Sequence, residues 1–130
     1  MNLKHSKQRD SIKAFLATRK DHPTADVVYT NVRQSFPNIS LGTVYRNLTL
    51  LSDIGEIARL RIGDGVDHFD YDTSPHYHFV CSECGCVIDL DIPVEEQITK
   101  AAKENFKGEI EGQVTYFYGR CKNCIQKYNN

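Results

Sequence analysis

Apolar side chains in the first half of the chain recur at intervals of three and four, the spacing of one face of an α-helix. The pattern predicts three short helices, and each follows a residue that can cap it: Ser6, Thr24 or Ser40. The inward positions are Ile12, Phe15, Leu16, Val28, Val32, Phe36, Val44, Leu48 and Leu51. We expect the second helix to run to Pro37-Asn38 and the third to end at Gly55, where glycine suits a left-handed C-terminal cap.

The segment after the third helix changes from helical spacing to alternation. Residues 56–69 alternate on either side of Gly63-Asp64-Gly65, which predicts a hairpin. The short Pro37-Asn38-Ile39 connection joins the two preceding helices. Two helices joined by a tight turn and followed by a hairpin indicate a winged helix-turn-helix domain.

The second half of the chain mixes strand-like and helical patterns. Residues 87–92 predict a strand with Ile88, Leu90 and Ile92 inward and with Val87, Asp89 and Asp91 outward. Residues 94–106 predict a helix that starts after Pro93, and residues 113–120 predict a final strand. The fold class is therefore α+β. We expect a winged-helix domain in residues 1–68, followed by a small α+β domain of antiparallel strands and one helix in residues 69–130.

Charge is distributed unevenly along the 130 residues. The net charge is −1, but residues 1–62 sum to +5 and residues 63–130 sum to −6. A basic first half favours a polyanion and an acidic second half favours metal cations, whereas solvated faces without a partner are the alternative. Neither a signal-peptide pattern nor an apolar run long enough to span a membrane is present in the sequence, so we expect a cytoplasmic protein without membrane contact.

Two Cys-x-x-Cys pairs stand in the second half, Cys81 with Cys84 and Cys121 with Cys124. In a reducing cytosol such pairs are more often metal ligands than disulfides, and four thiolates are a common structural zinc set. We expect one structural Zn²⁺ per chain that closes the 36 residues between the pairs. Two redox pairs are the alternative. The fifth cysteine, Cys86, is expected to be a buried, inert thiol.

A second group of possible ligands carries nitrogen and oxygen donors. His76 and His78 are two residues apart, so an extended segment points both imidazoles the same way, and Asp70 and Asp89 lie in neighbouring predicted strands. Mixed imidazole and carboxylate donors suit Fe²⁺, Mn²⁺ or Zn²⁺. Satisfied structural histidines are the alternative. For His68 we expect a solvated or a structural role. Whether His5 binds metal is left open.

The outward face of the third predicted helix carries polar side chains that suit DNA. An arginine can bond bidentately to a guanine edge, and tyrosine or threonine can pack on a thymine methyl. The candidate DNA contacts are Arg9, Ser40, Thr43, Tyr45, Arg46 and Asn47. An exposed polar face without a partner is the alternative. A zinc hydrolase or redox enzyme using His76 and His78 is disfavoured because no carboxylate follows them in a hydrolase pattern.

These motifs together resemble the ferric uptake regulator (Fur) family of dimeric, metal-dependent repressors. The similarity runs almost from end to end and rests on residues 22–26, 39–48, 69–70 and 76–85 and on the last Cys-x-x-Cys pair. The resemblance implies a winged helix followed by a dimerisation domain, with the four cysteines on structural zinc. It also implies one regulatory Fe²⁺ or Mn²⁺ per chain, with ligands His22, Asp70, His76, His78 and Asp89.

The resemblance further implies a mechanism. His22 lies in the first domain, so metal binding fixes the hinge between the domains, and the closed homodimer binds a palindromic operator in double-stranded DNA. Asp89 stands where iron-sensing members usually have glutamate, which favours the peroxide-responsive (PerR) branch, where bound iron leads to oxidation of histidine ligands, here His22 and His76. The iron-responsive branch is the alternative, since an arginine at position 46 resembles the recognition helix of that branch. A regulator that responds to another metal is a further alternative. The chain begins with little of the additional N-terminal helix of many members, so a difference in DNA affinity or in operator choice is expected.

Overall fold

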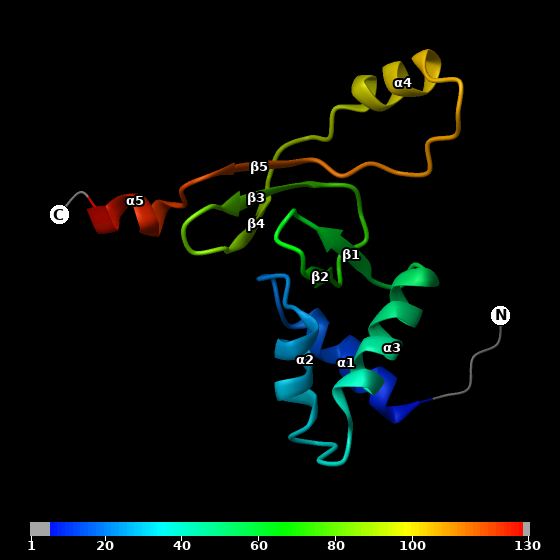
Figure 1. Ribbon diagram of the computed structural model, residues 1–130, viewed down its shortest axis with the longest axis vertical. Helices are drawn as coiled ribbons and strands as arrows, with labels where there is room; N and C mark the ends of the chain where they lie inside the picture. The colour runs from blue at the N-terminus through cyan, green and yellow to red at the C-terminus, as the bar shows by residue number, and fades with distance from the viewer. Residues whose placement is uncertain (1–5, 129–130) are drawn as a thin grey trace. The chain divides into compact units, whose positions relative to one another are not determined.

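The computed structural model describes residues 6–128 and divides into two units, Met1–Ser74 and Pro75–Asn130 (Figure 1). Within the described residues, no helix is long and apolar enough to cross a membrane. His5 lies outside the described part of the chain. Each unit has its own hydrophobic cluster, and the two clusters differ greatly in composition.

The first unit begins with the three helices that the apolar spacing predicts. These are α1 (Lys7–Ala17), α2 (Ala25–Val32) and α3 (Leu41–Asp53). The backbone N–H of Arg9 donates to Ser6 Oγ and that of Thr43 donates to Ser40 Oγ, both at 3.1 Å, which confirms two of the caps. The buried core of this unit consists of Ile12, Leu16, Ala25, Val28, Val32, Ile39, Val44, Leu48, Leu51, Ile57 and Phe69.

The ends of α2 and α3 show one wrong prediction and one confirmed prediction. α2 ends at Val32 and does not continue to Pro37. Beyond Val32 the N–H groups of Gln34 and Ser35 donate to carbonyl oxygens three residues back, so the chain continues in tighter turns. Phe36 still packs on the core from this turn, which explains its helical spacing. α3 ends as expected at Gly55, which has a φ of 79°. The N–H of Glu56 donates to Leu51 O at 3.0 Å, the bond that closes a glycine-capped helix end.

The predicted hairpin follows α3. Strand β1 (Ala58–Arg61) pairs antiparallel with β2 (Asp67–Asp70) along its whole length. β2 is also tied to the start of α2, because the N–H of Phe69 donates to Pro23 O at 3.0 Å. The expected domain boundary after residue 68 lies inside β2. The first unit instead extends to Ser74 and so includes the whole of this strand.

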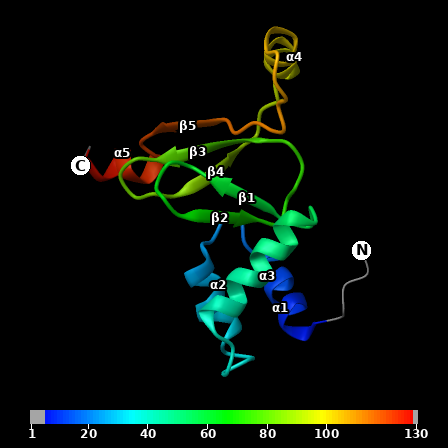
Figure 2. The same ribbon diagram turned by 45° about the vertical axis from the view of Figure 1, so that its right-hand side comes forward.

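The second unit contains a three-stranded sheet of mixed direction. Its strands are β3 (Tyr77–Cys81), β4 (Val87–Leu90) and β5 (Tyr116–Gly119), in the order β4-β3-β5. β4 is antiparallel to β3, as expected, but β5 is parallel to it, so the prediction of an all-antiparallel sheet is wrong. A parallel neighbour requires a long crossover, and the segment with helix α4 (Glu96–Asn105) provides it (Figure 2). A further helix, α5 (Lys122–Tyr128), was not expected.

Side-chain burial in the second unit reverses part of the prediction. Val87 is 4% exposed, whereas Ile88 is 44% and Ile92 is 47% exposed, the opposite of the predicted facing. Val87 directly follows Cys86 and pairs with Val80, so it lies beside the cysteines that form the core of this unit. None of the described residues of α4 is buried, although its predicted apolar positions include Ile98.

Candidate metal centres

The sheet of the second unit brings the two Cys-x-x-Cys pairs together. Cys81 ends β3, Cys84 lies in the turn that follows it, Cys121 comes after β5 and Cys124 lies in α5. Cys81 Sγ lies 3.6 Å from Cys124 Sγ, and Cys84 Sγ lies 3.8 Å from Cys121 Sγ. Four sulfurs bound tetrahedrally to zinc at about 2.3 Å are separated from one another by about 3.8 Å. These separations therefore fit a zinc ion.

Backbone amides prepare some of these sulfurs to bind a cation. The N–H groups of Cys84 and Cys121 donate to Cys81 Sγ at 3.5 and 3.4 Å, and they lower the pKa of the Cys81 thiol to about 6. The N–H of Cys124 likewise lowers the pKa of Cys121. The neighbouring Cys121 sulfur and burial raise the pKa of Cys124. Since zinc binds thiolates, it has to displace a proton from this thiol.

The parallel pairing of β3 with β5 fastens the two cysteine pairs to each other. The N–H of Ser82 donates to Gly119 O at 2.7 Å, and the Ser82 hydroxyl donates to the same oxygen at 2.9 Å. Arg120 Nε lies 2.9 Å from a carboxylate oxygen of Glu83. These contacts join residues that are far apart in the sequence but adjacent to the cysteines.

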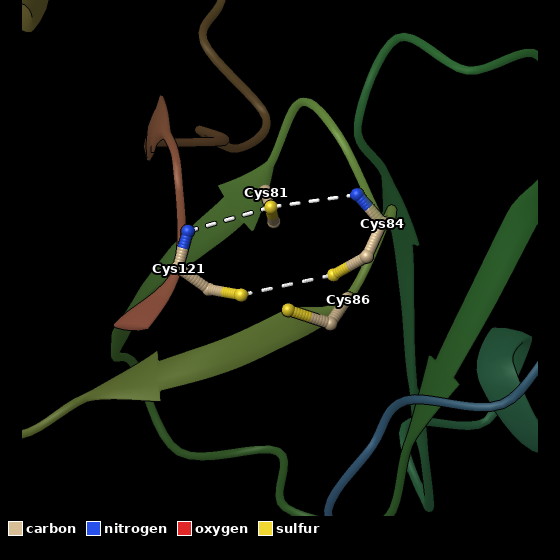
Figure 3. Close-up of side chains that lie close together, drawn as sticks. All are labelled: Cys81, Cys84, Cys86 and Cys121. Atoms are coloured by element: carbon tan, nitrogen blue, oxygen red, sulfur yellow. Dashed lines mark hydrogen bonds between the residues drawn. The ribbon is translucent and has the colours of Figure 1, made fainter. Parts of the chain in front are cut away.

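Cys86 also lies in this cluster, although the sequence analysis set it apart from the other cysteines. Figure 3 shows its sulfur turned toward the sulfurs of Cys81, Cys84 and Cys121, and these four atoms all lie within 4.8 Å of one another. Burial, more than the neighbouring sulfurs, raises the pKa of Cys86 to about 12. The sequence held one signal for this, a glycine between Cys84 and Cys86 that lets the chain turn back.

The histidine and aspartate candidates lie in two groups, one in each unit. In the first unit, His22 Nε2 lies 3.1 Å from Asp70 Oδ2, and both side chains are buried. We call these two residues the His22–Asp70 pair. Asp70 ends β2 and therefore belongs to the first unit, whereas the expected domain boundary put it in the second.

The backbone of His22 has an unusual conformation that a neighbouring histidine supports. His22 has a φ of 56°, in the left-handed region that L-residues rarely adopt. Its carbonyl oxygen lies 3.0 Å from His68 Nδ1, while His68 Nε2 lies 2.7 Å from Asp64 Oδ2. His68 is thus a structural residue, one of the two roles expected for it.

The second group consists of His76, His78 and Asp89, which we call the His76–His78–Asp89 group. His78 on β3 pairs directly with Asp89 on β4. Asp89 Oδ1 lies 3.0 Å from His76 Nε2 and 3.3 Å from His78 Nε2, and the two imidazole centroids are 4.4 Å apart. Nitrogen and carboxylate donors gathered at this distance suit Fe²⁺, Mn²⁺ or Zn²⁺.

The candidate DNA contacts on α3 are unequally accessible. Tyr45 is 43% exposed and Arg46 is exposed, whereas Thr43 and Asn47 are half-buried. Arg46 Nη2 donates to Thr43 Oγ1 at 2.9 Å, which holds the guanidinium along the helix surface. The Ser40 hydroxyl is already engaged in capping α3. A sixth candidate, half-buried Arg9, lies in the first turn of α1.

Comparison with known proteins identifies the family. The model of the ferric uptake regulator family matches residues 1–114. The chain belongs to this family. It is 37% identical over 120 residues to the peroxide-responsive repressor PerR of Staphylococcus aureus, an alignment that covers 92% of this chain and 81% of that protein.

Solved structures of family members share the fold. The Campylobacter jejuni peroxide stress regulator has a TM-score of 0.74 and 29% identity, covering 90% of this chain and 88% of that one. The Vibrio cholerae ferric uptake regulator has a TM-score of 0.71 and 30% identity, covering 92% of each chain. The α+β fold class is confirmed. The family consists of transcriptional regulators, so the chain is a regulator rather than a hydrolase or a redox enzyme.

Proposed function

We propose that this family member is a homodimeric, metal-dependent repressor that releases its operator when hydrogen peroxide oxidises a histidine ligand. The observation that carries the proposal is the His76–His78–Asp89 group, in which an aspartate oxygen lies against two imidazole nitrogens at 3.0 and 3.3 Å. The similarity to the S. aureus peroxide-responsive repressor supports it. We propose that the protein acts in the cytoplasm, where the cysteines stay reduced.

The regulatory metal is proposed to bind both histidine-containing groups at once. The His22–Asp70 pair would supply one imidazole and one carboxylate, and the His76–His78–Asp89 group would supply two imidazoles and one carboxylate. Two carboxylates offset the charge of a divalent cation, and three imidazoles favour Fe²⁺ or Mn²⁺ over Mg²⁺ or Ca²⁺. Because the two groups belong to different units, an ion bound to both stabilises one arrangement of the units over others.

Peroxide sensing is proposed to act through the ligands themselves. Fe²⁺, when bound, would activate hydrogen peroxide so that one of its oxygen atoms is transferred to an imidazole and the other leaves as water, whereas Mn²⁺ would not. His22 and His76 are the proposed targets, and the gain of one oxygen atom on either imidazole removes a basic nitrogen donor. A site that has lost one of its donors binds the metal more weakly, so the arrangement that binds DNA is no longer favoured.

We assign DNA binding to the winged-helix domain expected in residues 1–68 and dimerisation to the domain expected in residues 69–130. The exposed guanidinium of Arg46 and the ring of Tyr45 would face the bases, and α3 would enter the major groove. Two such helices in a homodimer imply a palindromic operator in double-stranded DNA. Arg9, Ser40, Thr43 and Asn47 complete the proposed contact set.

Exposed apolar side chains in the second unit support its role in dimerisation. Several lie on β4, β5 and α4 and near them, in a unit that buries few residues of its own. They are Ile88, Ile92, Ile98, Phe106, Val114 and Phe117. Burial of such side chains between two copies would remove this apolar surface from water.

Mass spectrometry after brief exposure to dilute peroxide tests the proposal. The protein is loaded with Fe²⁺ in one sample and with Mn²⁺ in a matched control. We expect one added oxygen atom on His22 or His76 only with iron, together with loss of operator binding. Equal oxidation in both samples, or unmodified histidines in an iron-loaded protein that responds to peroxide, would contradict it.

Iron sensing is the alternative function, and Arg46 favours it, since this residue resembles the recognition helix of the iron-responsive branch. In that case the chain would release DNA when iron is withdrawn, and dilute peroxide would leave operator binding unchanged. The same two samples distinguish these outcomes.

A further inference from the structure

Five cysteine sulfurs lie in one cluster, one more than a four-coordinate zinc site uses. Cys81 Sγ lies 3.6 Å from Cys124 Sγ and Cys84 Sγ lies 3.8 Å from Cys121 Sγ, which accounts for the two Cys-x-x-Cys pairs. A second group of four sulfurs, in which every pair lies within 4.8 Å, consists of Cys81, Cys84, Cys86 and Cys121 (Figure 3). Both sets of four share three sulfurs and differ only in Cys86 or Cys124.

The backbone around Cys86 holds it in this position. The N–H of Cys81 donates to Cys86 O at 3.0 Å, and the N–H of Gly85 donates to Cys81 O at 2.9 Å. Gly85 has a φ of 76°, and this left-handed residue turns the chain so that Cys86 lies opposite Cys81. Cys86 therefore belongs to the same rigid turn as Cys81 and Cys84, and its sulfur is not a distant thiol that happens to point this way.

Cys124 is held by a different part of the chain. It lies in α5, which begins directly after Cys121 and ends the described part of the chain. Cys81, Cys84 and Cys86 can thus be positioned without α5, whereas Cys124 can take its place only when α5 is folded against the cluster.

We propose that Cys86 is an alternative zinc ligand that replaces Cys124 in the fourth coordination position. Cys81, Cys84 and Cys121 bind zinc in both states, and the fourth ligand is either Cys124 from α5 or Cys86 from the turn after β3. A zinc ion with either set has four sulfur ligands, the usual number for a structural site. The exchange moves one proton from the incoming thiol to the outgoing thiolate, with no oxidation or reduction. This inference rests on zinc binding at the two Cys-x-x-Cys pairs, whose sulfur separations fit that ion.

The experiment measures zinc content and the number of bound thiolates in full-length variants. Zinc per chain is determined after dialysis against a chelator, and Co²⁺ is then exchanged into the site, where the intensity of the sulfur-to-cobalt charge-transfer band counts the thiolates. We expect Cys124→Ser and Cys86→Ser each to retain about one metal ion with four thiolates. The double variant Cys86→Ser/Cys124→Ser should show three thiolates or lose the metal.

The variant Cys81→Ser is the matched control because it removes a sulfur that both sets share. If Cys124→Ser behaves like Cys81→Ser or like the double variant, Cys86 does not replace Cys124 and the inference is overturned, while the zinc site itself stands. If the unaltered protein contains no zinc and binds no Co²⁺ through sulfur, the zinc site fails as well.

The unaltered protein provides a second measurement that does not depend on folding of a variant. Zinc-loaded protein is treated slowly with a thiol-alkylating reagent, and the modified cysteine is located by peptide mass spectrometry. Exchange of the fourth ligand predicts modification of both Cys86 and Cys124. Modification of Cys86 alone, with Cys124 protected throughout, would contradict the exchange.

Discussion

Removal of zinc should unfold the second unit and leave the first unit folded. The second unit has a hydrophobic cluster of three buried cysteines, with Phe79 and Cys86 packed partly buried against them. The first unit has a cluster of eleven buried apolar residues among those described. Because the sulfurs themselves form the core of the second unit, loss of the ion that binds them removes its main contact.

The magnitude follows from the length of chain that the site closes. The two pairs are separated by 36 residues, and fixing the ends of such a loop costs about 4 kcal/mol of chain entropy. The other buried apolar side chains described in this unit, Tyr77 and Val87, contribute together about 3–6 kcal/mol. Ordering each backbone residue opposes folding by a further 1–2 kcal/mol or so. Two side chains cannot offset these terms, so the unit depends on zinc.

Amide hydrogen exchange read by mass spectrometry measures this directly. After treatment with a strong chelator, peptides from β3, β5 and α5 should lose protection, while peptides from α1 and α3 keep it. Added Zn²⁺ should restore protection and added Mn²⁺ should not, since thiolates prefer zinc. Cys81→Ser should match the chelated protein, and Cys86→Ser, which leaves both pairs intact, is the control. Persistent protection of β3 and β5 after zinc is removed would refute the reasoning.

Three further predictions concern the regulatory site, the DNA-binding helix and the support of His22. Asp89→Glu should keep metal-dependent operator binding but need more peroxide for release, as measured by binding titrations of the iron-loaded protein. Arg46→Ala should weaken operator binding by about 1–3 kcal/mol if the guanidinium contacts a base, whereas the control Arg33→Ala, at the end of α2, should weaken it less. His68→Ala removes two hydrogen bonds and should destabilise the first unit by about 1–3 kcal/mol in hydrogen exchange. The hydrogen bond to His68 also lowers the pKa of Asp64 below its ordinary 3.8. The stability that this bond contributes is therefore present above pH 3.8 and is lost as the pH falls through the folded-state pKa of Asp64. Asp64→Asn should remove this acid dependence.

Each of these predictions has an outcome that contradicts it. An Asp89→Glu protein as sensitive to peroxide as the unaltered one would remove Asp89 from the basis of the peroxide assignment. If Arg46→Ala and Arg33→Ala weaken operator binding equally, Arg46 contributes only general electrostatic attraction to DNA and does not contact a base. Unchanged protection around His22 in His68→Ala would show that the left-handed backbone there needs no support from this ring.

Features set by neighbouring residues were predictable from the sequence. The three helices follow from apolar spacing, and Ser6, Ser40 and Gly55 cap them because a capping bond forms between residues a few positions apart. The hairpin follows from alternation around a glycine-containing turn. The two Cys-x-x-Cys pairs are equally local, since each pair can present two sulfurs to one ion without help from the rest of the chain.

Features set by contacts between distant segments were not predictable. The parallel direction of β5 depends on the path of the chain through α4, so the expected antiparallel direction was wrong. The burial of Val87 depends on the cysteines beside it, so alternation along the strand predicted the wrong facing. Asp70 lies with His22 because β2 pairs with β1 and joins the first unit. Cys86 lies among the ligand sulfurs because Gly85 reverses the chain and β5 carries Cys121 to the same place. The sequence by itself therefore indicated which residues can carry metal chemistry, while the tertiary structure decided which of them lie together, since only packing brings distant segments within bonding distance.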